Sequence, residues 1–167
     1  MGDPVGYITA LIILDNEGNR IIAKYYNDEF ESIESQKNIE MKLFQKSNKL
    51  SILKQPDSEI LNIGSHICVF KFYVDIGIFI LGKINDNELA LAAVLDVIHQ
   101  CLEVVLKEGI ERKFMINNMS SVLLIIDEIV ENGIIMSLET EDILSRLDLK
   151  KTKRLTESFK FGEVFLI

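Results

Sequence analysis

Hydrophobic residues near the start of the chain follow the pattern of two short β-strands. Tyr7–Leu14 is rich in β-branched and apolar residues and stops at Asp15-Asn16-Glu17-Gly18. That tetrad is typical of a tight turn, because Asp and Asn tolerate turn backbone and Gly18 supplies positive φ. Asn19–Tyr26 then resumes the strand pattern. The chain is therefore predicted to begin with a β-hairpin.

The middle of the chain changes its hydrophobic period twice. Apolar residues recur at helical spacing between residues 32 and 48, which predicts an amphipathic helix. Pro56 lies in a segment, residues 49–58, that predicts a loop. Three apolar runs follow and predict strands, the last two as a second hairpin: Glu59–Ile63, His66–Tyr73 and Asp75–Leu81.

The second half of the chain has the period of helices. Asn85-Asp86-Asn87-Glu88 is close to a capping box and predicts the start of a helix that ends at Lys107 and Gly109. Glu111–Val130 predicts helix through most of its length, with Asn132-Gly133 as its stop signal, and Thr140–Leu147 predicts a last short helix. Runs of strands followed by helices indicate an α+β fold with an antiparallel sheet.

Composition and charge narrow the class of protein. A chain of 167 residues suits one domain, and a net charge of −8 argues against nucleic acid or an anionic membrane as a main partner. Two cysteines indicate a reducing compartment rather than a disulfide framework. No apolar segment has the roughly 20 residues of a bilayer span, and the N-terminus lacks the basic lead of a signal peptide. We therefore expect a cytoplasmic protein.

The histidines and cysteines suggest a zinc site that their spacing does not support. His66 and Cys68 would share one face of a strand, but His99 and Cys101 would lie about 200° apart on a helix. The second pair therefore cannot converge on one ion, and we interpret all four as structural residues. We expect neither a metal nor a cofactor.

Acidic residues gather in LIIDEIVENGIIMSLETEDIL, which raises the alternative of a hydrolase site. Asp127 and Glu131 would share a helix face while Glu128 points elsewhere, and no third group with a catalytic role lies nearby in the sequence. Nucleotide-binding and hydrolase motifs are absent. The acids are interpreted as a solvated helix end and the chain as non-enzymatic, and loss of activity on changing Asp127 or Glu128 would support the alternative.

The C-terminal segment has a composition of its own. Lys150, Lys151, Lys153 and Arg154 form a basic cluster, which is either a solvated linker or a contact for lipid headgroups or an acidic partner. The apolar end that follows is either docked on the domain or buried in a partner. We therefore divide the chain into a domain over residues 1–149 and a tail over residues 150–167. The tail residues expected to touch a partner are Phe159, Phe161 and Phe165.

Several segments, in order, resemble one known family. They are ILDNEGNRIIAKYYND from residue 13, DSEI from 57, NELALAAVL from 87, ERK from 111 and NMSSVLLIIDEIVENGII from 118. Together they resemble the zeta subunits of coatomer, the COPI vesicle coat, within the clathrin-adaptor small-subunit and longin-like family. The resemblance implies a longin-like α+β fold: a five-stranded antiparallel sheet sandwiched by helices, one on one face and the rest on the other. It implies structural roles for Asp15, Asn16, Gly18, Asp127, Glu128 and Gly133.

The resemblance also implies a function and a partner. Zeta-type subunits are non-catalytic and pair with the trunk of the gamma subunit, in a coat that carries cargo from Golgi to endoplasmic reticulum and within the Golgi. The chain would then be cytoplasmic, peripheral on Golgi and COPI vesicle membranes through the coat, and would not bind nucleic acid. We expect an edge strand and a flanking helix to meet gamma. The alternative is a clathrin-adaptor sigma chain that sorts cargo, which the zeta-like first hairpin disfavours.

Two parts of the chain depart from the family pattern. The loop Leu50–Asp57 is longer than the usual connection, and the segment after Leu149 matches poorly. Contacts made by the family's tail therefore cannot be transferred to this chain.

Overall fold

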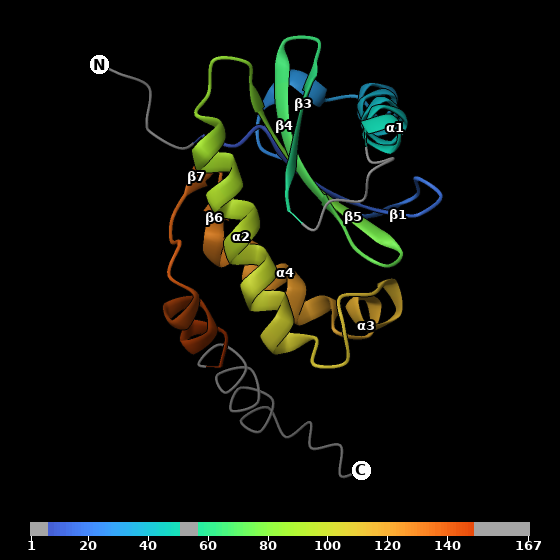
Figure 1. The fold of residues 1–167 in the computed structure, drawn as a ribbon. Coiled ribbons are helices and arrows are strands. Elements are labelled where there is room, and N and C mark those ends of the chain that lie inside the picture. The colour runs from blue at the N-terminus through green and yellow to red at the C-terminus, as the bar shows by residue number, and fades with distance from the viewer. Residues whose placement is uncertain (1–6, 51–56, 149–167) are drawn as a thin grey trace, which may run out of the picture.

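The computed structural model describes residues 7–50 and 57–148, which form a five-stranded antiparallel sheet with helices on both faces (Figure 1). The spatial order of the strands is β2-β1-β5-β4-β3. The predicted α+β class and five strands are confirmed. The strands are β1 (Ala10–Asp15), β2 (Arg20–Tyr25), β3 (Glu59–Ile63), β4 (His66–Phe72) and β5 (Ile76–Lys83).

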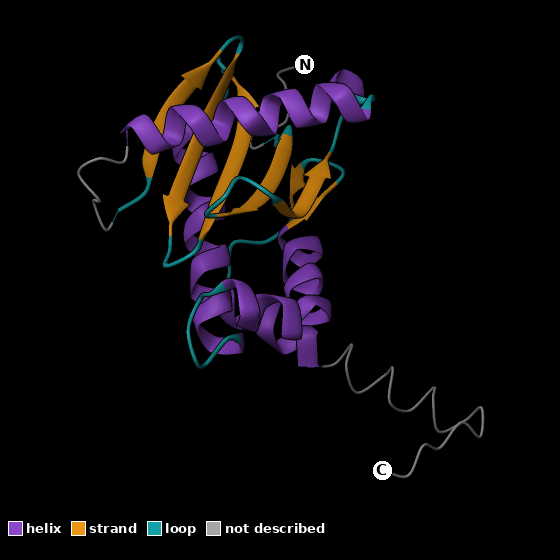
Figure 2. Cartoon of the chain, turned by 90° about the vertical axis from the view of Figure 1, so that its right-hand side faces the viewer, coloured by secondary structure: helices purple, strands orange, loops and turns teal. Residues whose placement is uncertain are grey.

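The helices divide between the two faces of the sheet as the family resemblance implies. Helix α1 (Ile33–Leu50) lies across one face, as Figure 2 shows, and a 3₁₀ turn, η1 (Asp28–Phe30), precedes it. Helices α2 (Glu88–Val105) and α4 (Met119–Ile129) cover the other face, and a short helix α3 (Arg112–Asn117) precedes α4. Residues 140–148 are also helical.

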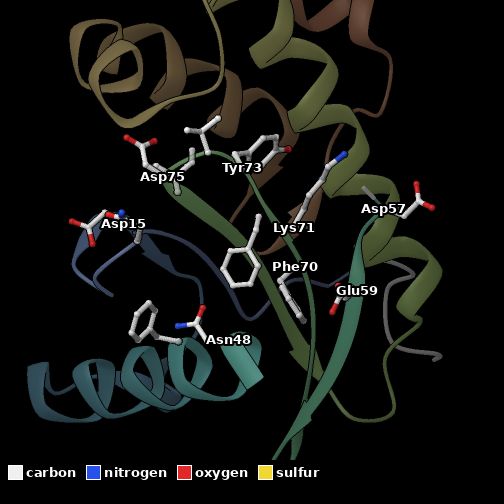
Figure 3. A pocket seen from close by; sticks show the side chains of 13 residues that line it. Asp15, Asn48, Asp57, Glu59, Phe70, Lys71, Tyr73 and Asp75 are labelled. Atoms are coloured by element: carbon white, nitrogen blue, oxygen red, sulfur yellow. The ribbon is translucent and has the colours of Figure 1, made fainter. Parts of the chain in front are cut away.

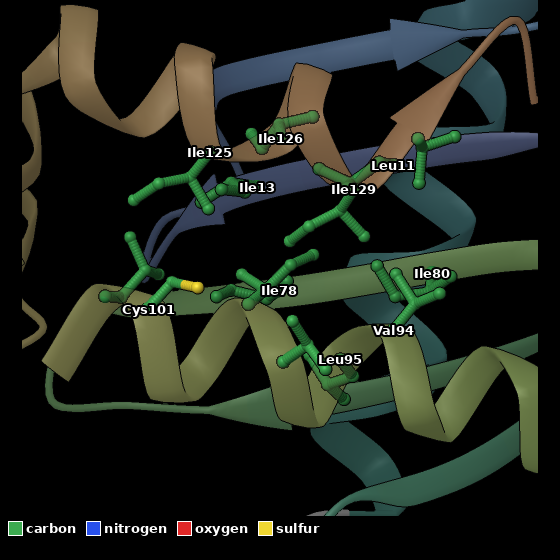
Figure 4. Close-up of a cluster of buried hydrophobic side chains, with 14 of the residues drawn as sticks. Leu11, Ile13, Ile78, Ile80, Val94, Leu95, Cys101, Ile125, Ile126 and Ile129 are labelled. Carbon is green, nitrogen blue, oxygen red and sulfur yellow. The ribbon is translucent and has the colours of Figure 1, made fainter. Parts of the chain in front are cut away.

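Both faces of the sheet are buried, because the central strands β1 and β5 carry apolar residues at successive positions. Leu11, Ile13, Ile78 and Ile80 point toward α2 and α4, where they pack with residues such as Val94 and Ile125 (Figure 4). The alternate residues of the same strands pack under α1: Ala10, Ile12 and Leu14 of β1, with Phe79 and Leu81 of β5. The α1 layer is the richer in phenylalanine.

One predicted helix is two helices in the structure. Residues 111–130 were expected to form one helix, but α3 ends at Asn117 and α4 begins at Met119. The break is at Asn118, whose side-chain amide donates a hydrogen bond to the carbonyl oxygen of Phe114 (2.8 Å). Asparagine competes in this way for backbone partners, which ends the first helix although the apolar period continues on both sides.

The residues after α4 form a hairpin that the sequence did not predict. Helix α4 ends at Ile129, and β6 (Val130–Glu131) pairs with β7 (Ile134–Ile135) around Asn132-Gly133. Asn132 and Gly133 both have positive φ, 51° and 84°, as the two central residues of a type I′ hairpin turn require. Glu131 therefore lies in a strand, and the expectation that it shares a helix face with Asp127 is wrong.

The start of α2 lies two residues later than the capping-box pattern suggests. Asn87 is the N-cap, and its side-chain oxygen accepts a hydrogen bond from the N–H of Leu89 (3.0 Å). The Asp86 carboxylate instead accepts from the N–H of Lys83 (2.7 Å), which closes the turn after β5. The helix ends at Val105, so Lys107 and Gly109 lie beyond it.

Candidate functional site

The turn between β1 and β2 is organised by the side chain of Asp15. Its Oδ1 accepts hydrogen bonds from the N–H groups of Glu17 and Asn19, each at 2.9 Å. Gly18 has a φ of 85°, and a Cβ there would lie 2.9 Å from the ring of Phe44 on α1. Asp15 and Gly18 therefore shape the turn and fit it against α1, whereas Asn16 is exposed and lines a cleft described below.

The pKa of Asp15 makes the stability of this turn depend on pH. Burial raises the pKa of the carboxyl, but hydrogen bonds from Asn19 and Glu17, with the charge of Arg112, outweigh burial and hold the pKa below its ordinary value. The ionised group therefore stabilises the fold above the unfolded-state pKa of about 3.9, and this contribution is lost as pH falls through the folded-state pKa. We expect Asp15→Asn to lower the free energy of unfolding by roughly 1 kcal/mol at pH 7.

Urea unfolding of the wild type and of Asp15→Asn at pH 7 and at pH 3 checks this expectation. The difference between the two proteins should be smaller at pH 3, because that pH lies below the unfolded-state pKa of about 3.9 and the contribution of the ionised carboxyl is already being lost there. An equal difference at both pH values would show that the carboxylate charge has no part in stabilising the turn.

The adjacent acids of α4 face basic partners on two different elements. The Asp127 carboxylate forms a salt bridge with the ammonium of Lys24 on β2. The Glu128 carboxylate lies 3.5 Å from the guanidinium of Arg146, in helical residues 140–148. These pairs join the end of α4 to the sheet and to the last helix. The arrangement suits structural ion pairs rather than a carboxylate dyad, because each acid points to its own cation.

A depression of about 440 Å³ lies beside these acids. The phenol of Tyr26 lines it, and burial, followed by the charge of Asp127, raises the pKa of that phenol. The hydroxyl therefore stays protonated at neutral pH. The other charged groups around the depression are Lys24, Asp127, Glu128, Glu131 and Arg146.

Gly133 approaches the first strand more closely than any other residue type would allow. Its carbonyl oxygen accepts a hydrogen bond from the N–H of Ile8 (2.6 Å). A Cβ on Gly133 would lie 2.7 Å from the carbonyl oxygen of Ile8 and 3.0 Å from the ring of Tyr7. The structure therefore joins the β6–β7 hairpin to the chain just before β1 through this glycine.

The histidines and cysteines lie apart. Cys68 is buried in the core under α1 and Cys101 in the core under α2, on opposite faces of the sheet. His66 lies 2.8 Å from the Glu29 carboxylate, and His99 bonds the Tyr73 hydroxyl (2.9 Å). Within the ranges that the structure describes, no three His, Cys, Asp or Glu side chains are grouped for a metal ion.

A cleft of about 620 Å³ lies at the end of the sheet where β1 ends and β5 begins. Figure 3 shows its labelled side chains, which come from α1, the β1–β2 turn, the start of β3, and β4 with the turn after it. Several are aromatic and several are acidic. No local sequence pattern indicates the cleft, because its walls come from distant segments. We call it the edge cleft; its lining includes Asp15, Asn48, Asp57, Glu59, Phe70, Phe72, Tyr73 and Asp75.

The predicted contacts of the tail lie outside the described residues. These are Phe159, Phe161 and Phe165, together with the basic cluster at residues 150–154 and most of the long loop between α1 and β3. In the described ranges, no helix has the length and apolarity to cross a bilayer.

Comparison with known proteins assigns the family. The family model for the clathrin adaptor complex small chain matches residues 7–154. The chain belongs to this family. It is 33% identical to human coatomer subunit zeta-1 over 86% of the chain and 77% of that protein. It is also 33% identical to coatomer subunit zeta of Saccharomyces cerevisiae, over 95% of the chain and 86% of that protein.

Structural comparison supports the longin-like fold of this small-chain family member. A chain in a homology model of the full-length AP-3 complex in a stretched open conformation matches with a TM-score of 0.66 and 16% identity, over 90% of this chain and 98% of that one. The two segments that resemble coatomer zeta subunits most, the first hairpin and the stretch from Asp127 to Gly133, are therefore part of the expected longin-like fold. Coatomer zeta and adaptor small chains are non-catalytic coat components, so the expectation that this chain is not an enzyme is confirmed by its family.

Proposed function

We propose that this chain is the zeta-type subunit of a coatomer (COPI) coat and pairs with the trunk of the gamma subunit. The observation that carries the proposal is its 33% identity to coatomer zeta subunits over most of its length. In this role it acts in Golgi-to-endoplasmic-reticulum and intra-Golgi transport. It is cytoplasmic and reaches Golgi and vesicle membranes only through the coat.

We further propose that the α1–β2 face, made by helix α1 and edge strand β2, meets gamma. Strand β2 ends the sheet, so its outer backbone edge has no strand beside it within the described residues. On α1 beside it, Ile33 is 70% exposed and Met41 is 52% exposed. Both line a depression of about 470 Å³ between the helix and the β1–β2 turn. An apolar pair on a helix beside an unpaired strand edge suits burial against a partner.

The α1–β2 face is held rigid by a buried carboxylate. Glu40 is only 6% exposed, and its Oε1 accepts hydrogen bonds from Arg20 Nε (2.8 Å) and from the Tyr25 hydroxyl (2.9 Å). Burial, followed by the negative charge of Glu40, raises the pKa of Tyr25, so that hydroxyl remains a donor. Helix and strand therefore present one preformed surface, which lowers the ordering cost of binding.

The test is affinity purification from cytosol with the tagged chain, followed by mass spectrometry of the bound proteins. Recovery of the gamma subunit with the other coatomer subunits is the expected result. Recovery of clathrin-adaptor large chains would instead assign the chain to the sigma branch. Recovery of neither class of large chain would overturn the proposal that it is a coat subunit.

The same purification tests the α1–β2 face. Ile33→Asp combined with Met41→Asp should abolish recovery of gamma, because two charges would be buried in an apolar contact. The matched control is Leu89→Asp with Val104→Asp on α2, whose side chains are 75% and 51% exposed. If the control double variant loses gamma and the α1 variant keeps it, the choice of face is wrong.

A further inference from the structure

The edge cleft contains a stretch of β4 whose outer side no described strand covers. Glu59 of β3 pairs with Phe70 of β4, and β3 begins at that residue. Strand β4 continues for two more residues, Lys71 and Phe72, which pair with β5 on the other side. An open strand edge of this kind can accept the backbone of an extended peptide.

One side of this open edge is lined with aromatic rings. Phe44, Phe70 and Phe72 all belong to the cluster under α1, and all three line the cleft. The ring centroids of Phe70 and Phe72 are 5.5 Å apart, and each ring also packs on Phe79. The rings are therefore fixed in place. Phe70 is only 1% exposed, so the partly exposed rings of Phe44 and Phe72 form the surface, which suits an apolar side chain or the flat face of a guanidinium.

Negative charges outnumber positive charges around the edge cleft. Four carboxylates line it, those of Asp15, Asp57, Glu59 and Asp75, against the single ammonium of Lys71. In the part of the chain that the structure describes, no basic side chain forms a salt bridge with Asp57 or Glu59. The cleft therefore presents negative charge that selects a cationic ligand.

The position of Glu59 places this charge beside the rings. Paired residues of neighbouring antiparallel strands project from the same face, so Glu59 lies on the same side of the sheet as Phe70. On the opposite side, the ammonium of Lys71 already lies 5.7 Å from the centroid of the Tyr73 ring. A cation over an aromatic ring is thus an arrangement that this end of the sheet supports.

We propose that the edge cleft binds an extended peptide segment in which an arginine stands two positions from an apolar residue. The peptide backbone lies along the open edge of β4. Its apolar side chain packs on the phenylalanine rings, and its arginine pairs with Glu59 or Asp57, because residues two apart in a strand share a face. Arginine suits this site better than lysine, since it pairs with carboxylates and stacks on rings at once. The proposal is independent of the coat function.

The test is fluorescence anisotropy of the full chain at 0.15 M salt with a fluorescein-labelled peptide, Ser-Arg-Thr-Leu-Thr-Arg-Ser. The expected result is saturable binding that is lost when both arginines of the peptide are replaced by glutamate. The double variant Asp57→Asn with Glu59→Gln should weaken binding about fivefold, because the arginine loses both of the carboxylates with which it can pair.

The matched control removes two carboxylates from the far end of the sheet. Asp28→Asn with Glu31→Gln has the same net charge as the cleft variant, and both residues are exposed. It should bind the peptide as the wild type does. Equal weakening by both double variants would show attraction to net charge alone and would overturn the proposal. So would an unchanged affinity of the cleft variant, or a wild type that does not bind the peptide.

Discussion

Replacing Phe79 with alanine is expected to lower the free energy of unfolding by about 3–5 kcal/mol. The side chain is fully buried on β5, the central strand, and its ring packs on Phe70 at 5.8 Å and on Phe72 at 6.1 Å between centroids. Alanine would leave a cavity enclosed by strands on each side and by α1 above, so the neighbouring rings could close it only in part. Urea unfolding followed by circular dichroism measures the loss.

The control for this prediction lies on the edge of the same sheet. Ile60 on β3 is 48% exposed, so Ile60→Ala removes less buried area and should lower the free energy of unfolding by no more than about 1 kcal/mol. If Phe79→Ala were as mild as Ile60→Ala, the packed ring cluster under α1 would not be a main source of stability.

Gly133→Ala is expected to lower the free energy of unfolding by about 2–4 kcal/mol, although it adds a single methyl group. A φ of 84° strains any residue with a Cβ by about 1–2 kcal/mol. The new Cβ would also lie 2.7 Å from the Ile8 carbonyl oxygen, so the backbone must separate and the hydrogen bond from Ile8 to Gly133 is weakened, at about 1 kcal/mol more. Urea unfolding gives the total, and hydrogen exchange at Ile8 reports the separation.

Gly64→Ala separates the strain of a positive φ from the close contact with Ile8. Gly64, in the turn between β3 and β4, has a φ of 58° but no atom within 4 Å of the position of a Cβ. Gly64→Ala should therefore lower the free energy of unfolding only by the strain that a positive φ causes in alanine, about 1 kcal/mol. Equal effects of the two substitutions would mean that the contact between Gly133 and Ile8 contributes nothing.

Local patterns were enough to predict the sheet and most of the helices. The apolar runs of β1 and β5, each ended by turn residues, indicate strands whichever partner they have. The break at Asn118 was missed because the apolar period is the same on both sides of it. The β6–β7 hairpin was missed because Asn132-Gly133 is equally typical of a helix stop and of a hairpin turn. Ile8, far away in the sequence, provides the contact that decides between them.

The candidate sites were less predictable than the fold. The acids Asp127 and Glu128 were recognisable as a pair in the sequence, but their partners Lys24 and Arg146 lie on elements remote from α4. The edge cleft takes its rings and its carboxylates from four separate segments. Spacing along one segment cannot reveal a surface of this kind, because the strand pairing of the sheet and the packing of α1 on it bring its parts together.

The strand order has a consequence for how the chain folds during synthesis. Strand β1 pairs with β5, and Ile12 lies opposite Phe79, with α1, β3 and β4 between them in the sequence. The N-terminal hairpin therefore leaves the ribosome with one edge of β1 uncovered, and that edge stays open until β5 has been made. The pairing of β1 with β5 brings together residues that are far apart in the sequence, which slows folding. Until β5 has been made, the apolar strand β1 stays exposed on that edge. The newly made chain should therefore depend on chaperones until β5 emerges.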